Sequence, residues 1–371
     1  MRISLPVENG DTLQALQGFL QKLLVEGVVD LLLVPMRTPS GTITPALVSD
    51  PGLLSQADPL APVLPVNAAT LAGQVSVRKP RPRVGAVLRS CEARALVELV
   101  KLQQASLEDM LVIAVDCAGA YGVAEYGKLV SSNGKPKDAL WQELFKSARL
   151  TPETPPAGLR QACQVCEQPI FDGAQVVIEL LEGGLAEQIR LTLPDALGEK
   201  LGFTPAEAGD RAQILAKLIE ARTARRDVEF AAIRARMEGT ENLSSIFAAC
   251  IRCHNCMTVC PICYCKTCVF KSPIFDHEPM QYSAWTRQKG AYRMPSDTTL
   301  FHLTRLNHMA LSCVGCGMCS EACPAELPVG MVFRAIGQRV QGVFNYQPGK
   351  NVDEKPPLIT FKADEWTEVG E

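Results

Sequence analysis

The chain has 371 residues, of which 47% are hydrophobic and 21% are charged, and its formal net charge at pH 7 is −3. This length and composition predict a folded protein of two or three domains. The charge balance gives no sign of the clustered basic face that a nucleic-acid partner requires. We expect neither a transmembrane segment, because no run of 18 apolar residues is present, nor a signal peptide. We therefore expect a cytoplasmic protein.

The first 120 residues alternate between helical and extended patterns. Leu16, Leu20 and Leu23 recur at the spacing of one helix face, whereas short apolar runs bounded by turn residues are typical of buried strands. Strands separated by helices predict a largely parallel α/β sheet. The pattern places helices at residues 11–25 and 91–104, strands at 28–34, 84–88 and 111–116, and a loop at 35–65 with a short strand at 46–49.

The middle of the chain predicts a loop, a hairpin and a long helix. The proline-rich stretch 150–159 is typical of a linker or a long loop. Two extended stretches, 175–181 and 187–193, are joined by a glycine-containing loop and predict an antiparallel hairpin. A capping box with a proline at its first helical position begins at Thr204, and the helical pattern that follows continues to about Met237.

Two runs of cysteines near the C-terminus have the spacing C-x2-C-x2-C-x3-C followed by proline. This is the ligand pattern of bacterial ferredoxins, in which three close cysteines and the fourth cysteine of the other run bind each [4Fe–4S] cluster. Zinc also binds C-x2-C pairs, but it requires neither the third cysteine step nor the Cys-Pro ending, and both occur twice here. The prediction is one cluster on Cys250, Cys253, Cys256 and Cys323, and another on Cys313, Cys316, Cys319 and Cys260.

The two runs are separated by an unusually long insert of 52 residues. It contains a helical pattern at 298–311, with His302, Arg305 and His308. Histidines on such a helix pack against neighbours more often than they bind metals, so we expect packing roles. Three further cysteines, Cys263, Cys265 and Cys268, directly follow the first run. They are either spare thiols or ligands of another metal, with His254, His277 or a partner subunit as the fourth ligand. Exchange of ligands among residues 260–268 also stays open.

Four more cysteines lie upstream, and two interpretations of them are open. Cys91 and Cys117 each follow a predicted strand, while Cys163 and Cys166 form a C-x2-C pair. Taken singly, such cysteines are most often buried structural residues. In the alternative interpretation, the four cysteines lie at the ends of strands and loops that meet, and together they bind a third [4Fe–4S] cluster.

The sequence resembles the beta-subunit family of the coenzyme F(420)-reducing hydrogenases and formate dehydrogenases. The matching stretches are VGAVLRSCEARAL, VIAVDCAG, ACQVCEQP and the two ferredoxin runs, and the resemblance covers residues 80–340. It implies an N-terminal flavin and iron–sulfur domain in which Cys91, Cys117, Cys163 and Cys166 hold a cluster beside a non-covalent FAD. Two positions depart from the family pattern: Ser90 stands where the family usually has proline, and Glu167 where it often has aspartate.

The flavin site rests on the resemblance, because the sequence contains neither a GxGxxG fingerprint nor a Walker loop. Within that resemblance, the best candidates for FAD binding are Arg89 and Ser90, where a strand ends and a helix begins, because backbone N–H groups at a helix start bind phosphate. No nucleophile–histidine–acid arrangement is present, and no catalytic side chain is assigned. The chemistry would belong to the cofactors.

These observations predict an α/β flavin and iron–sulfur domain followed by a mostly helical segment that carries a split ferredoxin-like module with two [4Fe–4S] clusters. The implied function is that of an oxidoreductase subunit that moves electrons between a two-electron carrier at FAD and partner subunits of a formate dehydrogenase, hydrogenase or heterodisulfide-reductase-like complex. The alternatives are a flavin-free electron-relay module and a redox-sensing or assembly protein. The expected parts are the α/β domain at 1–200, a linking helix at 201–240, the ferredoxin module at 241–345 and an extended tail at 346–371.

Overall fold

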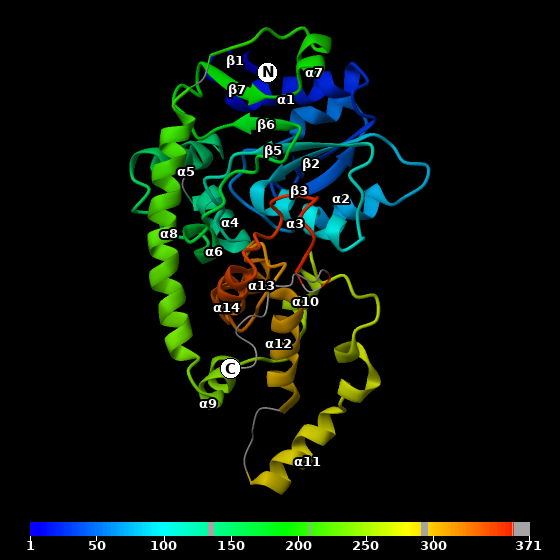
Figure 1. The fold of residues 1–371 in the computed structure, drawn as a ribbon, viewed down its shortest axis with the longest axis vertical. Coiled ribbons are helices and arrows are strands. Elements are labelled where there is room, and N and C mark those ends of the chain that lie inside the picture. Colours follow the sequence, from blue (N-terminus) through cyan, green and yellow to red (C-terminus); the bar gives the residue numbers. More distant parts are fainter. Residues whose placement is uncertain (133–136, 208, 291–295, 358, 360–371) are drawn as a thin grey trace.

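The structure is a computed structural model that describes residues 1–132, 137–207, 209–290, 296–357 and 359. Its N-terminal half is built on a seven-stranded sheet with the order β1-β7-β6-β5-β4-β2-β3 (Figure 1). The four central strands are parallel, whereas the pairs β1–β7, β6–β7 and β2–β3 are antiparallel. The strands are β1 Arg2–Pro6, β2 Leu31–Arg37, β3 Ile43–Val48, β4 Val84–Arg89, β5 Met110–Val115, β6 Val176–Glu179 and β7 Gln188–Thr192.

The α/β prediction is therefore confirmed in a coarser form: the sheet is mixed, and only its centre is parallel. The predicted hairpin is present as β6 and β7. The N-terminal strand β1 was not predicted, because its five residues carry too short a pattern to be separated from a loop. It is fixed by pairing with β7 along its whole length, from Arg2 opposite Thr192 to Pro6 opposite Gln188.

Helices cover both faces of the sheet. Successive residues of a strand point to opposite faces, and β5 shows this clearly: Ile113 lies in the core beneath α1 and α5, and Val112 in the core beneath α2 and α3. Helix α1 begins where the Asp11 carboxylate accepts a hydrogen bond from the Gln14 N–H at 2.8 Å. The helices of this half are α1 Thr12–Val25, α2 Ala69–Ser76, α3 Ser90–Lys101, α4 Val123–Ser132, α5 Lys137–Leu150, α6 Gln161–Gln164 and α7 Asp195–Lys200, with the 3-10 helix η1 Pro51–Gln56.

The long helix α8 (Arg211–Arg236) runs beside both halves of the molecule (Figure 1). The predicted start at Thr204 is wrong. The Ala206 N–H donates to the Arg2 carbonyl at 2.8 Å, and Pro205 forms a bridge with Ile3, so this segment pairs with the outer edge of β1 instead of coiling. A competing tertiary hydrogen bond has overridden the local capping pattern.

The C-terminal half is helical and has a separate core that contains the buried rings Phe230, Phe247, Phe301 and Phe333. The helix predicted at 298–311 is present as α12, shifted by two residues. In Figure 1 the helix α11 projects at the end remote from the sheet. The elements are α9 Thr240–Ile246, α10 Asn255–Thr258, η2 Val269–Lys271, η3 Pro273–Phe275, α11 Pro279–Lys289, α12 Ser296–Met309, α13 Met318–Glu321 and α14 Val329–Val343.

The described part of the tail after α14 lies on the α/β half. The Tyr346 hydroxyl and the Gly349 N–H both donate to one oxygen of the buried Glu98 carboxylate, at 2.6 and 2.8 Å, and Glu98 belongs to α3. The described tail therefore packs against the α/β half of the protein. The rest of the predicted tail, except Ile359, lies outside the described residues.

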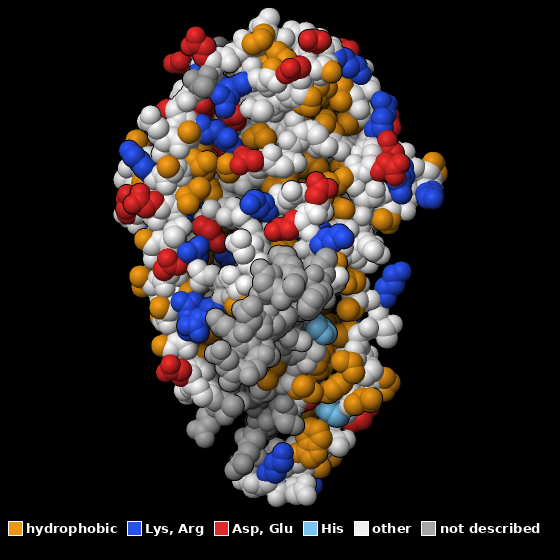
Figure 2. Space-filling model, in the orientation of Figure 1, with side chains coloured by type: hydrophobic (Ala, Val, Ile, Leu, Met, Phe, Trp, Pro, Cys, Tyr) orange, Lys and Arg blue, Asp and Glu red, His pale blue; other side chains and the backbone are white. Residues whose placement is uncertain are grey.

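Acidic and basic side chains are interspersed over the sheet half of the face shown in Figure 2. Hydrophobic side chains gather lower on this face, where Figure 1 places the loops after α10 and the helix α11. Exposed members from these segments include Val269, Ile274 and Met280. Within the described residues, no helix has the length and apolar character needed to span a membrane.

Candidate iron–sulfur centres

Cys250, Cys253, Cys256 and Cys323, here called the first ferredoxin set, lie together in the helical half. Burial raises the pKa of Cys256, and the nearby thiols of the other three members raise it further. Burial likewise raises the pKa of Cys250, and the nearby thiols of Cys323 and Cys253 raise it further. Because metal binding requires thiolates, a cluster bound here would displace protons from these thiols.

Cys260, Cys313, Cys316 and Cys319 form the second ferredoxin set. Burial raises the pKa of Cys319 well above its usual range, and Cys260, Cys316 and Cys313 add to the shift. Cys260 interacts with Cys316 and Cys313 in the same way. The structure therefore brings the eight cysteines together in the two groups of four that the spacing predicts, with the fourth cysteine of each run beside the other run.

Single helical turns position the third cysteine of each run. Helix α10 contains Cys256, and α13 contains Cys319. The residue before each turn, His254 or Gly317, has a left-handed backbone with φ of +59° or +70°. This conformation reverses the chain between the second and third cysteines, so that both thiols face the same space.

The four upstream cysteines also meet. Cys91 lies in the first turn of α3, Cys117 follows β5, Cys163 lies in α6, and Cys166 follows that helix. All four line one cavity, and Cys316 of the second ferredoxin set lines it as well. Burial raises the pKa of Cys117 to about 11, with a further contribution from Cys163, while nearby guanidinium groups oppose the rise.

Buried arginines surround this upstream set. Arg89, Arg94, Arg160 and Arg222 are all at most 8% exposed. Among the described residues, Nη1 of Arg89, Nε of Arg94 and Nη1 of Arg160 have no hydrogen-bond partner. Buried cations are costly unless a negative charge compensates them. Four thiolates on a cluster would supply that charge, so this donor set fits an anionic iron–sulfur centre.

The three groups follow one another in space. Cys91 of the upstream set interacts with Cys316 of the second ferredoxin set. The Arg160 guanidinium lies between them: it donates to the Cys316 carbonyl at 3.2 Å and interacts with Cys163 and Cys91. Arg305 lies near both ferredoxin sets. It donates to the Cys256 sulfur of the first set at 3.0 Å, and its charge lowers the pKa of Cys260 in the second set. The order is upstream set, second set, first set.

Comparison with known proteins bears on these groups directly. Residues 246–327 match the family model described as a 4Fe-4S dicluster domain. Two curated relatives are the F(420)-dependent formate dehydrogenase subunit beta of Methanocaldococcus jannaschii, 23% identical over 76% of this chain and 77% of the relative, and the F(420)-dependent formate dehydrogenase 1 subunit beta of Methanococcus maripaludis, 25% identical over 95% and 94%.

The chain is similar in sequence to the beta subunits of F(420)-dependent formate dehydrogenases. This confirms the resemblance and the expected class, an oxidoreductase. A solved chain of the F(420)-reducing [NiFe] hydrogenase complex from Methanosarcina barkeri is also similar, with 9% identity, a TM-score of 0.43 and coverage of 65% of this chain and 94% of that chain. That structural similarity is too small to carry an argument.

The predicted flavin residues Arg89 and Ser90 are buried and line the cavity of the upstream cysteines. The Ser90 hydroxyl donates to the Ile170 carbonyl at 2.7 Å, and the Arg89 guanidinium donates to the Ala61 carbonyl. The Glu92 carboxylate accepts the Arg89 backbone N–H at 3.0 Å, which satisfies a donor at the start of α3. FAD binding by Arg89 and Ser90 stays a prediction.

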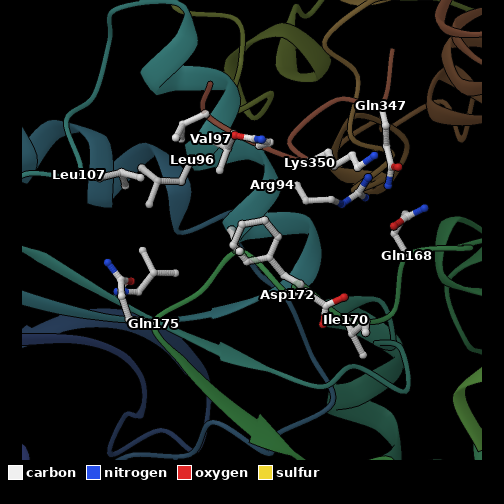
Figure 3. A pocket seen from close by; sticks show the side chains of 16 residues that line it. Arg94, Leu96, Val97, Leu107, Gln168, Ile170, Asp172, Gln175, Gln347 and Lys350 are labelled. Carbon is white, nitrogen blue, oxygen red and sulfur yellow. The ribbon is translucent and has the colours of Figure 1, made fainter. Parts of the chain in front are cut away.

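A larger cavity of about 540 Å³ lies beside α3 (Figure 3). Arg94, Gln168, Gln347 and Lys350 gather at one end of it, and apolar residues including Leu96 line the other. Gln168 also lines the upstream cysteine cavity, so the two cavities are neighbours. Sequence reasoning missed this site, because its wall combines α3 with a tail segment more than 250 residues away in the chain.

His302 of α12 has a packing role, as expected, and it also contacts a cysteine sulfur. His302 stacks on Phe247 with 3.9 Å between the ring centroids, and its Nε2 lies 3.3 Å from the Cys250 sulfur. Burial lowers the pKa of His302 to about 4. A neutral imidazole at this distance influences the sulfur environment of the first ferredoxin set.

Proposed function

We propose that this chain is the electron-transfer beta subunit of an F(420)-linked oxidoreductase, a formate dehydrogenase or hydrogenase, with three [4Fe–4S] clusters and one FAD. The observation that carries the proposal is the succession of three groups of four cysteines, each next to the following one. The relatives are named as subunits of F(420)-dependent formate dehydrogenases, so the partners of this chain would be other subunits of such a complex.

When bound, the clusters exchange single electrons and the flavin exchanges electrons singly or in pairs. The residues of this chain fix where that exchange occurs. Cys91 and Cys316 line the same cavity, so two centres held by these cysteines would be neighbours. The buried arginines would compensate the negative charge of the thiolates.

The end of the relay nearest the surface is the first ferredoxin set. Cys253 is exposed, whereas the thiols of the second set are at least partly buried. Exposed apolar side chains, including Ile251 at 67% and Val269 at 52%, lie in the same region. Apolar surface next to an exposed ligand is suited to a partner subunit that exchanges electrons there.

Because Arg89 and Ser90 line a much smaller cavity of about 30 Å³, we place the flavin in the 540 Å³ cavity beside α3. Its polar end, with Arg94 and Lys350, is suited to phosphate groups, and its apolar end, with Phe171, Leu96 and Leu107, is suited to a ring system. The Arg94 side chain lies at the polar end of the cavity, next to Lys350 and Gln347 (Figure 3). Gln168 lies between the cavity and the upstream cysteines.

The cluster part of the proposal is tested by iron content. The chain is purified and reconstituted without oxygen, and iron, acid-labile sulfide and flavin are measured per chain. Replacing Cys117 and Cys166 by serine should remove about four irons relative to the unaltered chain. A Lys146→Ala variant at an exposed position of α5 serves as the control. Equal iron content in the double variant and the unaltered chain would show that the upstream cysteines are structural.

The flavin part is tested by titrating FAD into the same protein. Lys350→Glu puts a negative charge at the polar end of the cavity and should weaken binding about tenfold, which corresponds to about 1.4 kcal/mol. Lys355→Glu makes the same change on the tail outside the cavity and should leave the affinity unchanged. A protein that holds no FAD even after reconstitution would be a flavin-free relay module.

A further inference from the structure

The three cysteines that follow the first ferredoxin run are not used by any of the three sets above. Cys263, Cys265 and Cys268 line one cavity of about 400 Å³, beside α12. Cys263 interacts with both of the others. The cavity lies next to the first ferredoxin set, because Met257, which directly follows Cys256, forms part of its wall and lies 3.7 Å from the Cys268 sulfur.

Two residues of α12 complete the lining of this cavity with chemistry that is suited to a metal centre. His308 supplies an imidazole on the wall of the cavity. Arg305 is only 3% exposed, and its Nε has no hydrogen-bond partner among the described residues. Arg305 donates a hydrogen bond to the Cys256 sulfur, and its charge also lowers the pKa of Cys263. A buried cation with an unpaired donor favours negative charge in the cavity, and thiolates provide it.

The spread of the donors indicates which kind of centre fits. Three cysteines and a histidine form a common zinc set when all four converge on one ion. Nowhere in the described ranges are three His, Cys, Asp or Glu side chains placed to hold a single ion. The two ferredoxin sets share this property, since a cubane distributes its ligands over separate irons. A cavity lined by separated thiols therefore fits a cluster better than it fits one zinc ion.

We propose that Cys263, Cys265 and Cys268, with His308 as the fourth ligand, bind an additional [4Fe–4S] cluster at the surface of the helical half. This site goes beyond the proposed function and does not require the flavin. Cys265 is exposed and Cys263 and Cys268 are partly buried, so the cluster would lie beside the first ferredoxin set on the side facing solvent.

The test compares the full chain with a variant in which Cys263, Cys265 and Cys268 are all serine, both reconstituted without oxygen. The unaltered chain should contain about four irons and four sulfides more than the variant. The electron paramagnetic resonance signals of the other clusters should remain. Thr267→Ser, in the same loop and lining the same cavity, is the matched control and should keep the full iron content.

A second variant makes the assignment specific. His308→Ala should remove the nitrogen hyperfine coupling from one cluster signal, while His308→Cys should keep the full iron content and lack that coupling. Equal iron in the unaltered chain and the triple variant would overturn the proposal. So would the loss of one zinc per chain without loss of iron, or loss of the second-set signal, which would show that one of these thiols serves that cluster. If the upstream cysteines of the proposed function bound no cluster, the unaltered chain would still contain about four irons more than the triple variant. The two proposals can therefore fail independently.

Discussion

The two cysteine runs have the same spacing and the same backbone, but they differ in what surrounds them. The second and fourth residues after the first cysteine are left-handed in both runs: Arg252 and His254 have φ of +57° and +59°, and Gly315 and Gly317 have +75° and +70°. Residues with a side chain rarely adopt this conformation. The ligand loop therefore requires a left-handed backbone at these two positions. The surrounding structure then determines which residue type each position can hold.

In the second run that environment is the α/β half of the protein. A Cβ atom on Gly317 would lie 2.3 Å from the Cβ of Ala162 in α6, and one on Gly315 would lie 2.6 Å from Nε of Arg334. Only glycine fits such close contacts. The second run therefore forms the junction with the upstream cysteines.

In the first run the same two positions carry side chains that hold the insert. Arg252 donates to the Tyr282 hydroxyl at 2.5 Å and pairs with Asp297, while His254 stacks on Phe301 at 4.5 Å. One spacing has thus been used for two purposes: a close junction inside the molecule and an anchor for an outward-facing segment.

The largest expected effect tests whether the two runs exchange their fourth ligands. Cys323→Ser should remove about four irons and the signal of the first ferredoxin set, and leave the second set intact. Cys260→Ser should do the reverse. Iron analysis and electron paramagnetic resonance of each reconstituted variant measure the outcome. If Cys323→Ser abolished the signal of its own run instead, the grouping seen in the structure would be wrong for the bound state.

The next effect tests the difference in environment. Gly317→Ala places a Cβ in a left-handed residue against Ala162 and should lower the stability of the junction by about 1–3 kcal/mol. His254→Ala, at the equivalent position, removes a stacking contact and should cost less than about 1 kcal/mol. The urea midpoint for loss of visible cluster absorbance compares the two variants. Equal midpoints would show that contact with the α/β half does not constrain the second run.

Much of this architecture could be predicted because it is local in the sequence. The central strands and the grouping of the eight ferredoxin cysteines follow from short patterns and ligand spacing, whereas the grouping of the four upstream cysteines was implied only by the family resemblance. The start of α8 could not be predicted, because residues 205–206 bond to a strand about 200 residues earlier. Arg94 and Arg305 resemble ordinary surface charges in the sequence, and only the fold shows that both are buried beside cysteines.

A third effect concerns the cation beside the first run. Arg305 donates to the Cys256 sulfur at 3.0 Å and is buried, so its charge stabilises the more negative, reduced form of a cluster. Arg305→Gln should lower the reduction potential of the first-set cluster by on the order of 60 mV, the equivalent of about 1.4 kcal/mol for one electron. Redox titration followed by electron paramagnetic resonance measures it. Arg287→Gln on α11, an exposed position, is the control and should leave the potential unchanged.

The smallest effect separates anchoring from cluster binding in the first run. Arg252→Ala removes the ion pair with Asp297 and the hydrogen bond to Tyr282, but it keeps the backbone N–H that lies 3.4 Å from the Cys250 sulfur. Because these partners are partly exposed, the loss should be about 1 kcal/mol. Hydrogen exchange should speed up in α11 and at the start of α12, while the iron content stays constant. Loss of iron in this variant would show that the insert and the first cluster are held as one unit, which would erase the proposed division of roles between the two runs.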